Sequence, residues 1–398
     1  MTTFSPLESA ALELIASSQA QTRAAIAREL GVAPSTASSL ISSLLSARVI
    51  REEGEMRSTG GRRAVRLVAC ETNERSLVVE LGANHALLSL VDLDGAVREP
   101  RSIPLDIGLG PEKVLQQVMT SGATMAAEVG VTVTAVGLGI PGPVEMDTGR
   151  IVSPSRMPGW HNTYAKDLLE DMWGVPAVVE NDARLGAVGT MAYRRHRHEP
   201  TYQDYIYVKA GSAIGGALVV DGTVHRGSFG LAGDLSHVPV EAAADRACRC
   251  GNRGCLDTLA SAEALRRDLG FADNDSLIAA AINSDADVVN GVREAGVRLG
   301  ASLAHVVSFL NPQAIIVGGT LSSIGAFLAG IRQALNEFCL PAITEHLAVE
   351  VSLAGREATL WGLAEQTNSL LTKTVKSRTG ASSGTSTSPL LDPTKELL

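Results

Sequence analysis

The stretch YIYVKAGSAIGGALVVDGTVHRG (residues 205–227) decides the fold, because it places two apolar runs on either side of a glycine-rich turn. The runs at 205–208 and 217–220 are rich in aromatic and β-branched residues, which predicts two neighbouring strands. The same sequence pattern, an apolar run typical of a buried strand followed by a glycine-rich or polar turn, occurs in VTAVGLGIPGPVE (133–145), VPAVVENDARLGAVG (175–189) and PQAIIVGGTL (312–321). Helical patterns such as 262–269 and 292–310 separate these stretches. Strands that alternate with helices predict an α/β fold.

Composition sets the broad class. The chain has 398 residues, of which 45% are hydrophobic and 19% charged, and this length is enough for two or three domains. No apolar run approaches the roughly 18 residues that a membrane helix needs. The N-terminus carries Glu8 and Glu13 and no early basic residue, so it does not resemble a signal peptide. We therefore expect a cytoplasmic protein without a membrane segment, in which thiols stay reduced.

The first 70 residues differ in charge from the rest. They contain eight arginines and six glutamates, a net charge of +2, whereas the whole chain carries −9. A basic end on an acidic body favours a module that contacts DNA. Within it, a helix capped by Ser5 is followed by helices over about 22–30 and from Pro34 onward, which is the helix-turn-helix pattern.

A wing is expected after the last of these helices. Residues 49–68 alternate like a hairpin with STGGRR at its tip, where two glycines permit a tight turn. The alternative to DNA binding is that the N-terminal module is a small helical domain that binds another protein. The candidate DNA contacts are hydroxyl side chains of the second helix of the motif and arginines of the wing: Ser35, Thr36, Ser38, Ser39, Arg57, Arg62 and Arg63.

Three of the five cysteines lie in one short segment, ACRCGNRGCLD (247–257). A disulfide between Cys248 and Cys250 would close a very small, strained ring and is disfavoured. Three thiolates with a histidine are a common set of ligands for structural zinc, and the glycines of the segment would let the chain wrap round a metal. The alternative is that Cys248, Cys250 and Cys255 are three free thiols in a loop.

The order of the motifs resembles the ROK family, which groups bacterial sugar kinases with sugar-responsive transcriptional repressors. The matching segments are GLGIPGPVE (137–145), MPGWHN (157–162), VVENDA (178–183), GSAIGGALVVDGTVHRG (211–227), AGDLSH (232–237), CRCGNRGCLD (248–257) and LNPQAIIVGG (310–319). The resemblance implies two actin/hexokinase-like α/β lobes around a cleft. It also implies structural Zn²⁺ held by His237 with the three clustered cysteines. The N-terminal winged helix-turn-helix is similar to the repressor branch of the family, because its kinases usually lack one.

The resemblance also implies a sugar site formed by Asn181, Asp182, Asp234, His237 and Asp257. In the kinases, the aspartate that matches Asp182 accepts the proton of the attacking sugar hydroxyl. The alternative is that Asp182 only caps the helix that begins at Ala183. The family usually has Glu where this chain has Asp234 and Asp257, so the reach of the pocket differs and the identity of the sugar stays open.

The predicted phosphate loops depart from the kinase pattern. The kinases have Asp-x-Gly-Gly-Thr where this chain has Glu-Leu-Gly-Ala-Asn (80–84), and Ala213 replaces a glycine of the second loop. Two added methyl groups oppose close approach of the backbone to a phosphate. We therefore expect no enzyme activity, with Asp182 as a vestigial base.

The sequence thus predicts a sugar-responsive regulator, most simply a repressor, that binds operator DNA and is released by a sugar or sugar phosphate. The alternatives are an ATP-dependent sugar kinase with an appended DNA-binding domain and a regulator whose effector is a protein. We expect a homodimer or homotetramer. The predicted domains are a winged helix (1–70), lobe 1 (75–190, completed by a helix over 355–372), lobe 2 (191–354) and a disordered tail (373–398).

Overall fold

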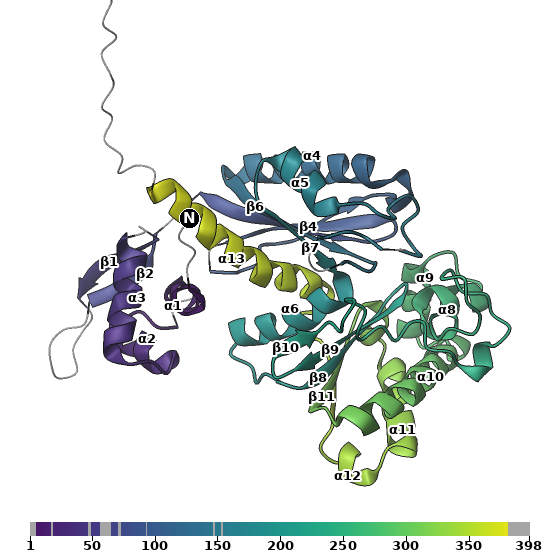
Figure 1. Cartoon of the computed structure of the whole chain (residues 1–398). Helices are drawn as coiled ribbons and strands as arrows, with labels where there is room; N and C mark the ends of the chain where they lie inside the picture. The colour runs from purple at the N-terminus through teal and green to yellow at the C-terminus, as the bar shows by residue number, and fades with distance from the viewer. Residues whose placement is uncertain are drawn as a thin grey trace, which may run out of the picture. The chain divides into compact units, whose positions relative to one another are not determined.

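The chain forms two compact units in the computed structural model, Met1–Thr72 with Ser369–Leu398, and Asn73–Asn368. The structure describes residues 5–380, apart from 17–18, 47–48, 56–64, 71–72, 93, 146–147 and 153. Figure 1 shows the helices and strands of both units.

The first unit consists of a three-helix cluster and a two-stranded antiparallel sheet. Its elements are α1 (Pro6–Ala16), α2 (Arg23–Glu29), α3 (Pro34–Ser46), β1 (Ile50–Glu55) and β2 (Val65–Ala69). The start of α1 is a capping box, since the Glu8 N–H donates to Ser5 Oγ at 3.2 Å and the Ser5 N–H donates to Glu8 Oε2 at 2.7 Å. Ile26, Ile41 and Leu67 bring α2, α3 and β2 into one buried core. This is the element order expected for a winged helix-turn-helix.

The second unit contains two sheets that repeat one strand order, β5-β4-β3-β6-β7 and β10-β9-β8-β11-β12. In both sheets the last three strands in this order run parallel, and the remaining strand pairs are antiparallel. The first sheet is formed by β3 (Glu74–Leu81), β4 (His85–Val91), β5 (Arg101–Pro104), β6 (Thr132–Ile140) and β7 (Ala177–Asn181). The second is formed by β8 (Tyr205–Ala210), β9 (Ile214–Val220), β10 (Thr223–His225), β11 (Ala314–Gly318) and β12 (Ala348–Val351). Each sheet is the centre of one α/β lobe.

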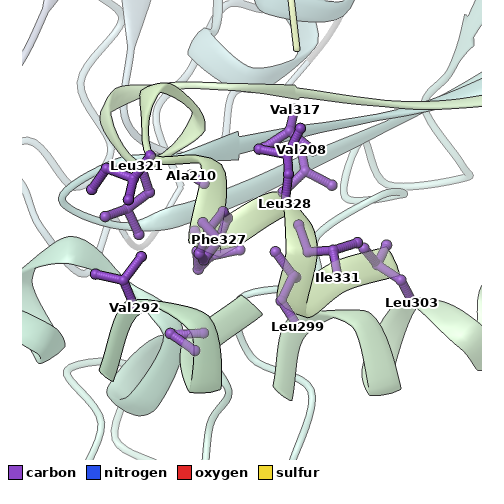
Figure 2. Packing of buried hydrophobic residues seen from close by; sticks show 14 of the residues in the cluster. Val208, Ala210, Val292, Leu299, Leu303, Val317, Leu321, Phe327, Leu328 and Ile331 are labelled. Atoms are coloured by element: carbon purple, nitrogen blue, oxygen red, sulfur yellow. The ribbon is translucent and has the colours of Figure 1, made fainter. Parts of the chain in front are cut away.

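Helices cover the outer face of each sheet (Figure 1). Lobe 1 carries α4 (Pro111–Val129) and α5 (Ala165–Trp173). Lobe 2 carries α7 (Asp257–Ala260), α8 (Ala262–Asp268), α9 (Asn274–Ile282), α10 (Ala286–Leu310), α11 (Gly325–Phe338) and α12 (Pro341–Thr344). Figure 2 shows how Leu299 and Leu303 of α10 and Phe327 and Ile331 of α11 pack beneath Val317 and its strand neighbours, all fully buried. This apolar layer fixes the helices of lobe 2 on its sheet.

Two helical segments lie between the sheets: α6 (Asp182–His196) and the part of α13 (Ala358–Gly380) that belongs to the second unit (Figure 1). Leu360 and Leu363 of α13 join Val78 of β3 in one buried cluster, and Trp361 joins Tyr205 of β8 in another. The helix predicted over 355–372 therefore packs on both lobes, whereas the sequence placed it with lobe 1 alone.

Two predicted boundaries differ from the structure. The boundary between 190 and 191 falls inside α6, because this helix follows β7 of lobe 1 and packs against β8 and β9 of lobe 2. The tail predicted from 373 is wrong for its first eight positions, since α13 continues to Gly380. No proline or glycine interrupts the chain between Gly362 and Gly380, so the helix can continue through a Ser/Thr-rich composition. Residues 381–398 lie outside the described part of the chain. Within the described residues, no helix is long and apolar enough to cross a membrane.

Candidate functional site

His237, Cys248, Cys250 and Cys255 converge, with their four ligand atoms within 4.8 Å of one another. The sulfurs of Cys250 and Cys255 are 3.7 Å apart, and Cys248 Sγ is 3.6 Å from His237 Nδ1. In a tetrahedral site with Zn–S of about 2.3 Å and Zn–N of about 2.0 Å, such pairs are separated by about 3.8 and about 3.5 Å. The cluster therefore has the donor set and the spacing to hold a metal ion.

Local backbone geometry explains the convergence. Gly251 (φ +95°) and Gly254 (φ +80°) adopt left-handed conformations that favour glycine and turn the chain back within a few residues. The Cys248 N–H donates to the carbonyl oxygen of Asn252 at 2.8 Å. All five cysteines of the chain lie among the described residues, and all are free thiols.

Asn181, and not Asp182, caps α6. The Asn181 side-chain oxygen accepts hydrogen bonds from the N–H groups of Ala183 at 3.1 Å and Arg184 at 3.2 Å, and its amide donates to the Gly142 carbonyl at 3.1 Å. The alternative that Asp182 serves as the helix cap is therefore wrong. Asp182 is the first residue of α6, and its side chain is available for another role.

Asp182 lies in a buried charge cluster that the sequence did not indicate. Lys209 of β8 places its ammonium 2.7 Å from Asp182 Oδ2 and 2.5 Å from Glu80 Oε1 of β3. Burial raises the pKa of Asp182 above its ordinary value, and the Lys209 ammonium opposes that shift. Burial alone would lower the pKa of Lys209, but the two carboxylates raise it above its usual range. Lys209 is therefore charged at neutral pH.

Asp257 is also engaged by protein groups. Its Oδ1 accepts the Ile214 N–H at 2.8 Å, and its Oδ2 lies 2.6 Å from Nη2 of Arg156, which also contacts Glu263. The Asp257 N–H donates to the Ser236 carbonyl at 3.0 Å. Asp257 is thereby held directly beside the segment that carries the metal-cluster histidine.

Asp234 is exposed, and its Oδ1 accepts from the Ser236 N–H at 2.9 Å and from the Ser236 hydroxyl. The bond between Asp257 and Ser236 places Asp234, His237 and Asp257 in one neighbourhood. Asn181 and Asp182 stand at the other side of the start of β9, where Gly215 packs against Ala183. Lys209 and Arg156, the partners of Asp182 and Asp257, belong to no motif that would have identified them in the sequence.

The glycine loops predicted to hold phosphate make internal hydrogen bonds. Gly82 opens the β3–β4 turn, where its N–H donates to the His85 carbonyl at 2.8 Å. The Gly211 N–H donates to the Ala213 carbonyl at 3.0 Å, and Ser212 Oγ accepts from Asn274 at 2.9 Å. The Gly211 amide is thus already engaged by the protein.

The predicted DNA contacts on α3 lie on its outer face. Ser35, Thr36 and Ser39 are exposed and Ser38 is half-buried, whereas Ala37, Ile41 and Leu44 are buried on the opposite side. The predicted wing contacts, Arg57, Arg62 and Arg63, lie outside the described residues.

The chain belongs to the ROK family, whose sequence profile matches residues 76–368. It is 26% identical to a putative xylose repressor of Caldicellulosiruptor sp. over 83% of this chain and 87% of that protein. It is 29% identical to a glucokinase of Halalkalibacterium halodurans, over 59% of this chain and 77% of the glucokinase. A crystal structure of a ROK family transcriptional regulator, a homologue of the E. coli MLC protein, superposes with a TM-score of 0.75 at 24% identity, covering 93% of this chain and 98% of the other. The last comparison supports the fold.

Proposed function

We propose that the protein is a sugar-responsive, DNA-binding transcriptional regulator that represses genes for carbohydrate uptake or catabolism. The observation that carries this proposal is the joining, in one chain, of a unit with winged helix-turn-helix order to a ROK unit. The alignment with the putative xylose repressor covers 83% of this chain, which is more residues than 76–368 contain, so the alignment extends beyond the ROK segment. The match to the glucokinase covers 59% of the chain and needs no N-terminal unit.

In this proposal the exposed hydroxyl face of α3 enters the major groove of operator DNA, and the arginines of the wing bind the backbone or minor groove. The sequence-predicted contacts are Ser35, Thr36, Ser38, Ser39, Arg57, Arg62 and Arg63. A homodimer or homotetramer would present two such units to two half-sites. The protein would then act in the cytoplasm, where the operator lies.

The effector we propose is a sugar or sugar derivative, including a sugar phosphate, bound between the lobes. The residues that would hold it are Asn181, Asp182, Asp234, His237 and Asp257, which combine carboxylate acceptors with amide and imidazole donors. Hydroxyl groups of a sugar need such paired donors and acceptors to replace their hydrogen bonds to water.

Several features support binding without phosphoryl transfer. Ala83 and Ala213 add side chains to loops in which the kinases of the family have glycine, and the Gly211 amide is engaged by the protein. The carboxylate that would serve as a base, Asp182, is paired with Lys209. The Lys209 ammonium opposes the rise in the pKa of Asp182 that burial causes, so it lessens the basicity that burial alone would give this carboxylate.

The metal we propose at the histidine–cysteine cluster is Zn²⁺, held by His237, Cys248, Cys250 and Cys255. All four tetrahedral positions would be filled by protein ligands, which is typical of a structural site. The zinc would cross-link the segment before Cys248 to the segment that leads into α7, and so would orient His237 and Asp257.

The test begins with DNA. Purified protein is incubated with fragments of its source genome, bound fragments are sequenced, and one is labelled for a polarisation titration. D-Xylose, D-glucose, N-acetyl-D-glucosamine and their phosphates are then added. We expect one of them to weaken DNA binding at least about tenfold, which requires about 1.4 kcal/mol of differential affinity.

The matched variants are Asp182→Asn and Asp171→Asn, the latter an exposed carboxylate on α5. Loss of a charged hydrogen-bond partner costs about 1.5–3 kcal/mol, so Asp182→Asn should need about ten to a hundred times more sugar, whereas Asp171→Asn should respond like the wild type. Absence of any bound fragment would contradict the DNA-binding part of the proposal. In a separate assay with ATP and each sugar, formation of ADP would favour the kinase alternative.

A further inference from the structure

The first strands of the two lobes carry opposite charges at equivalent positions. Glu80 is the next-to-last residue of β3 and faces Gly139 of the parallel neighbour β6, and Lys209 is the next-to-last residue of β8 and faces Gly318 of β11. The two strands hold the same central place in sheets that repeat one strand order. The Glu80–Lys209 ion pair therefore joins the centres of the two lobes.

The ion pair lies largely away from solvent, which strengthens the interaction between its charges. The side chains of Glu80, Asp182 and Lys209 are only 14%, 11% and 23% exposed, so water screens their charges weakly. Two carboxylates share one ammonium, and both depend on it for compensation. Removing the ammonium would leave two partly buried carboxylates as neighbours.

A second bridge crosses between the lobes in the opposite direction. Arg156 belongs to lobe 1, because the next residue, Met157, is buried in the core of that lobe. Its guanidinium binds Asp257 and Glu263, and Leu256 beside Asp257 is buried in the core of lobe 2. Each lobe thus extends one cation to carboxylates of the other.

The carboxylates held in this way include two of the proposed sugar ligands, Asp182 and Asp257. One oxygen of Asp182 lies against Lys209, and both oxygens of Asp257 already accept hydrogen bonds. A sugar hydroxyl that donates to Asp257 must share Oδ2 with Arg156 or Oδ1 with the Ile214 N–H, or displace one of these donors. Effector binding and the bridges between the lobes therefore compete for the same atoms.

We propose that Lys209 and Arg156 are positioning residues that form an interlobe latch, together with Glu80, Asp182, Asp257 and Glu263. The latch stabilises the sugar-free arrangement of the lobes, and effector binding weakens it. This inference rests on the proposed function for its sugar, but the ion pairs can be tested without one. By linkage, any change that weakens the latch without touching the sugar must raise the affinity for the sugar.

The first experiment measures thermal unfolding of the full, metal-containing chain between pH 5.5 and 8.0 for Lys209→Met, Lys209→Met/Glu80→Gln and the control Lys113→Met, an exposed lysine of α4. In Lys209→Met the folded-state pKa of a carboxyl in the pair rises above its unfolded value, so stability is lost as the pH rises through that raised pKa. We expect the unfolding temperature of Lys209→Met to fall below that of the wild type by several degrees at pH 8.0 and by less at pH 5.5. Adding Glu80→Gln should recover part of the loss. Behaviour like that of Lys113→Met at every pH would overturn the latch.

The second experiment measures sugar affinity by calorimetry for the wild type, Glu80→Gln and Glu263→Gln. Neither glutamate belongs to the proposed sugar site, and each holds one cation of the latch. We expect each variant to bind the effector sugar at least about threefold more tightly. Equal or weaker binding would overturn the competition between sugar and latch. If none of the sugars binds the wild type, the proposed function fails, while the pH profile of Lys209→Met still decides whether the ion pairs couple the lobes.

Discussion

Gly189→Ala adds one methyl group where α6 crosses α13, the two helices between the sheets. A Cβ atom at Gly189 would lie 1.8 Å from the carbonyl oxygen of Ala358 and 2.5 Å from the backbone nitrogen of Gly362. A carbon–oxygen contact normally needs about 3.3 Å. Both obstacles are backbone atoms, so the helices must separate, because no side chain can rotate away.

The cost follows from this geometry. Overpacking a close-packed core by one methyl group costs about 1–3 kcal/mol, and this site belongs at the upper end because the backbone must move. The higher helix propensity of alanine offsets about 1 kcal/mol. We therefore expect a net loss of about 2 kcal/mol in the free energy of unfolding, or about 4–8 °C in the unfolding temperature of a domain of this size.

The assay is calorimetric or fluorescence-monitored unfolding of the full chain. The control is Gly325→Ala at the start of α11, where an added Cβ meets no atom within 4 Å and should leave stability nearly unchanged. If Gly189→Ala and Gly325→Ala unfolded at the same temperature, the close approach of α6 and α13 would be refuted. The packing between the lobes would then need another description.

Two further predictions concern the metal and the wing. Atomic emission should find one zinc per chain in the wild type, and Cys250→Ser should lose this zinc and unfold at a lower temperature. The control Cys70→Ser, outside the cluster, should keep the metal. A stable wild-type protein without zinc would contradict the site. Replacing Arg62 and Arg63 with alanine should weaken DNA binding and reduce the slope of log affinity against log salt by about 2, and an unchanged titration would remove the wing from the DNA interface.

Local signals in the sequence predicted the elements that local interactions specify. Ser5 and Glu8 form the capping box that their spacing predicts. The limits of α2 lie within a residue or two of those predicted, and α3 begins at Pro34 as predicted. The cysteine segment also folds as its spacing indicates, since Gly251 and Gly254 supply the left-handed turns. These features depend on contacts between residues that are near one another in the chain.

Features that depend on distant contacts could not be predicted in this way. Lys209 and Glu80 are 129 positions apart, and Arg156 and Asp257 are 101 apart. No periodicity or motif links such residues, because their meeting depends on how two complete lobes pack. The capping role of Asn181 was missed for a different reason: Asn181 and Asp182 are both good cap residues, and only the position where α6 begins distinguishes them.

Phosphoryl transfer and sugar sensing place different demands on one scaffold. A kinase needs a carboxylate that is free to accept a proton and loops whose N–H groups can bind phosphate. Here the ammonium of Lys209 neutralises the carboxylate of Asp182, and the Gly211 amide is satisfied within the protein. In the proposed latch, the ion pairs of Lys209 with Asp182 and Glu80 also join the lobes, and a sugar hydroxyl would compete for Asp182. A sensor needs this arrangement, because a ligand shifts a conformational equilibrium only by the difference in its affinity for the two states, and competition with an interlobe ion pair provides such a difference.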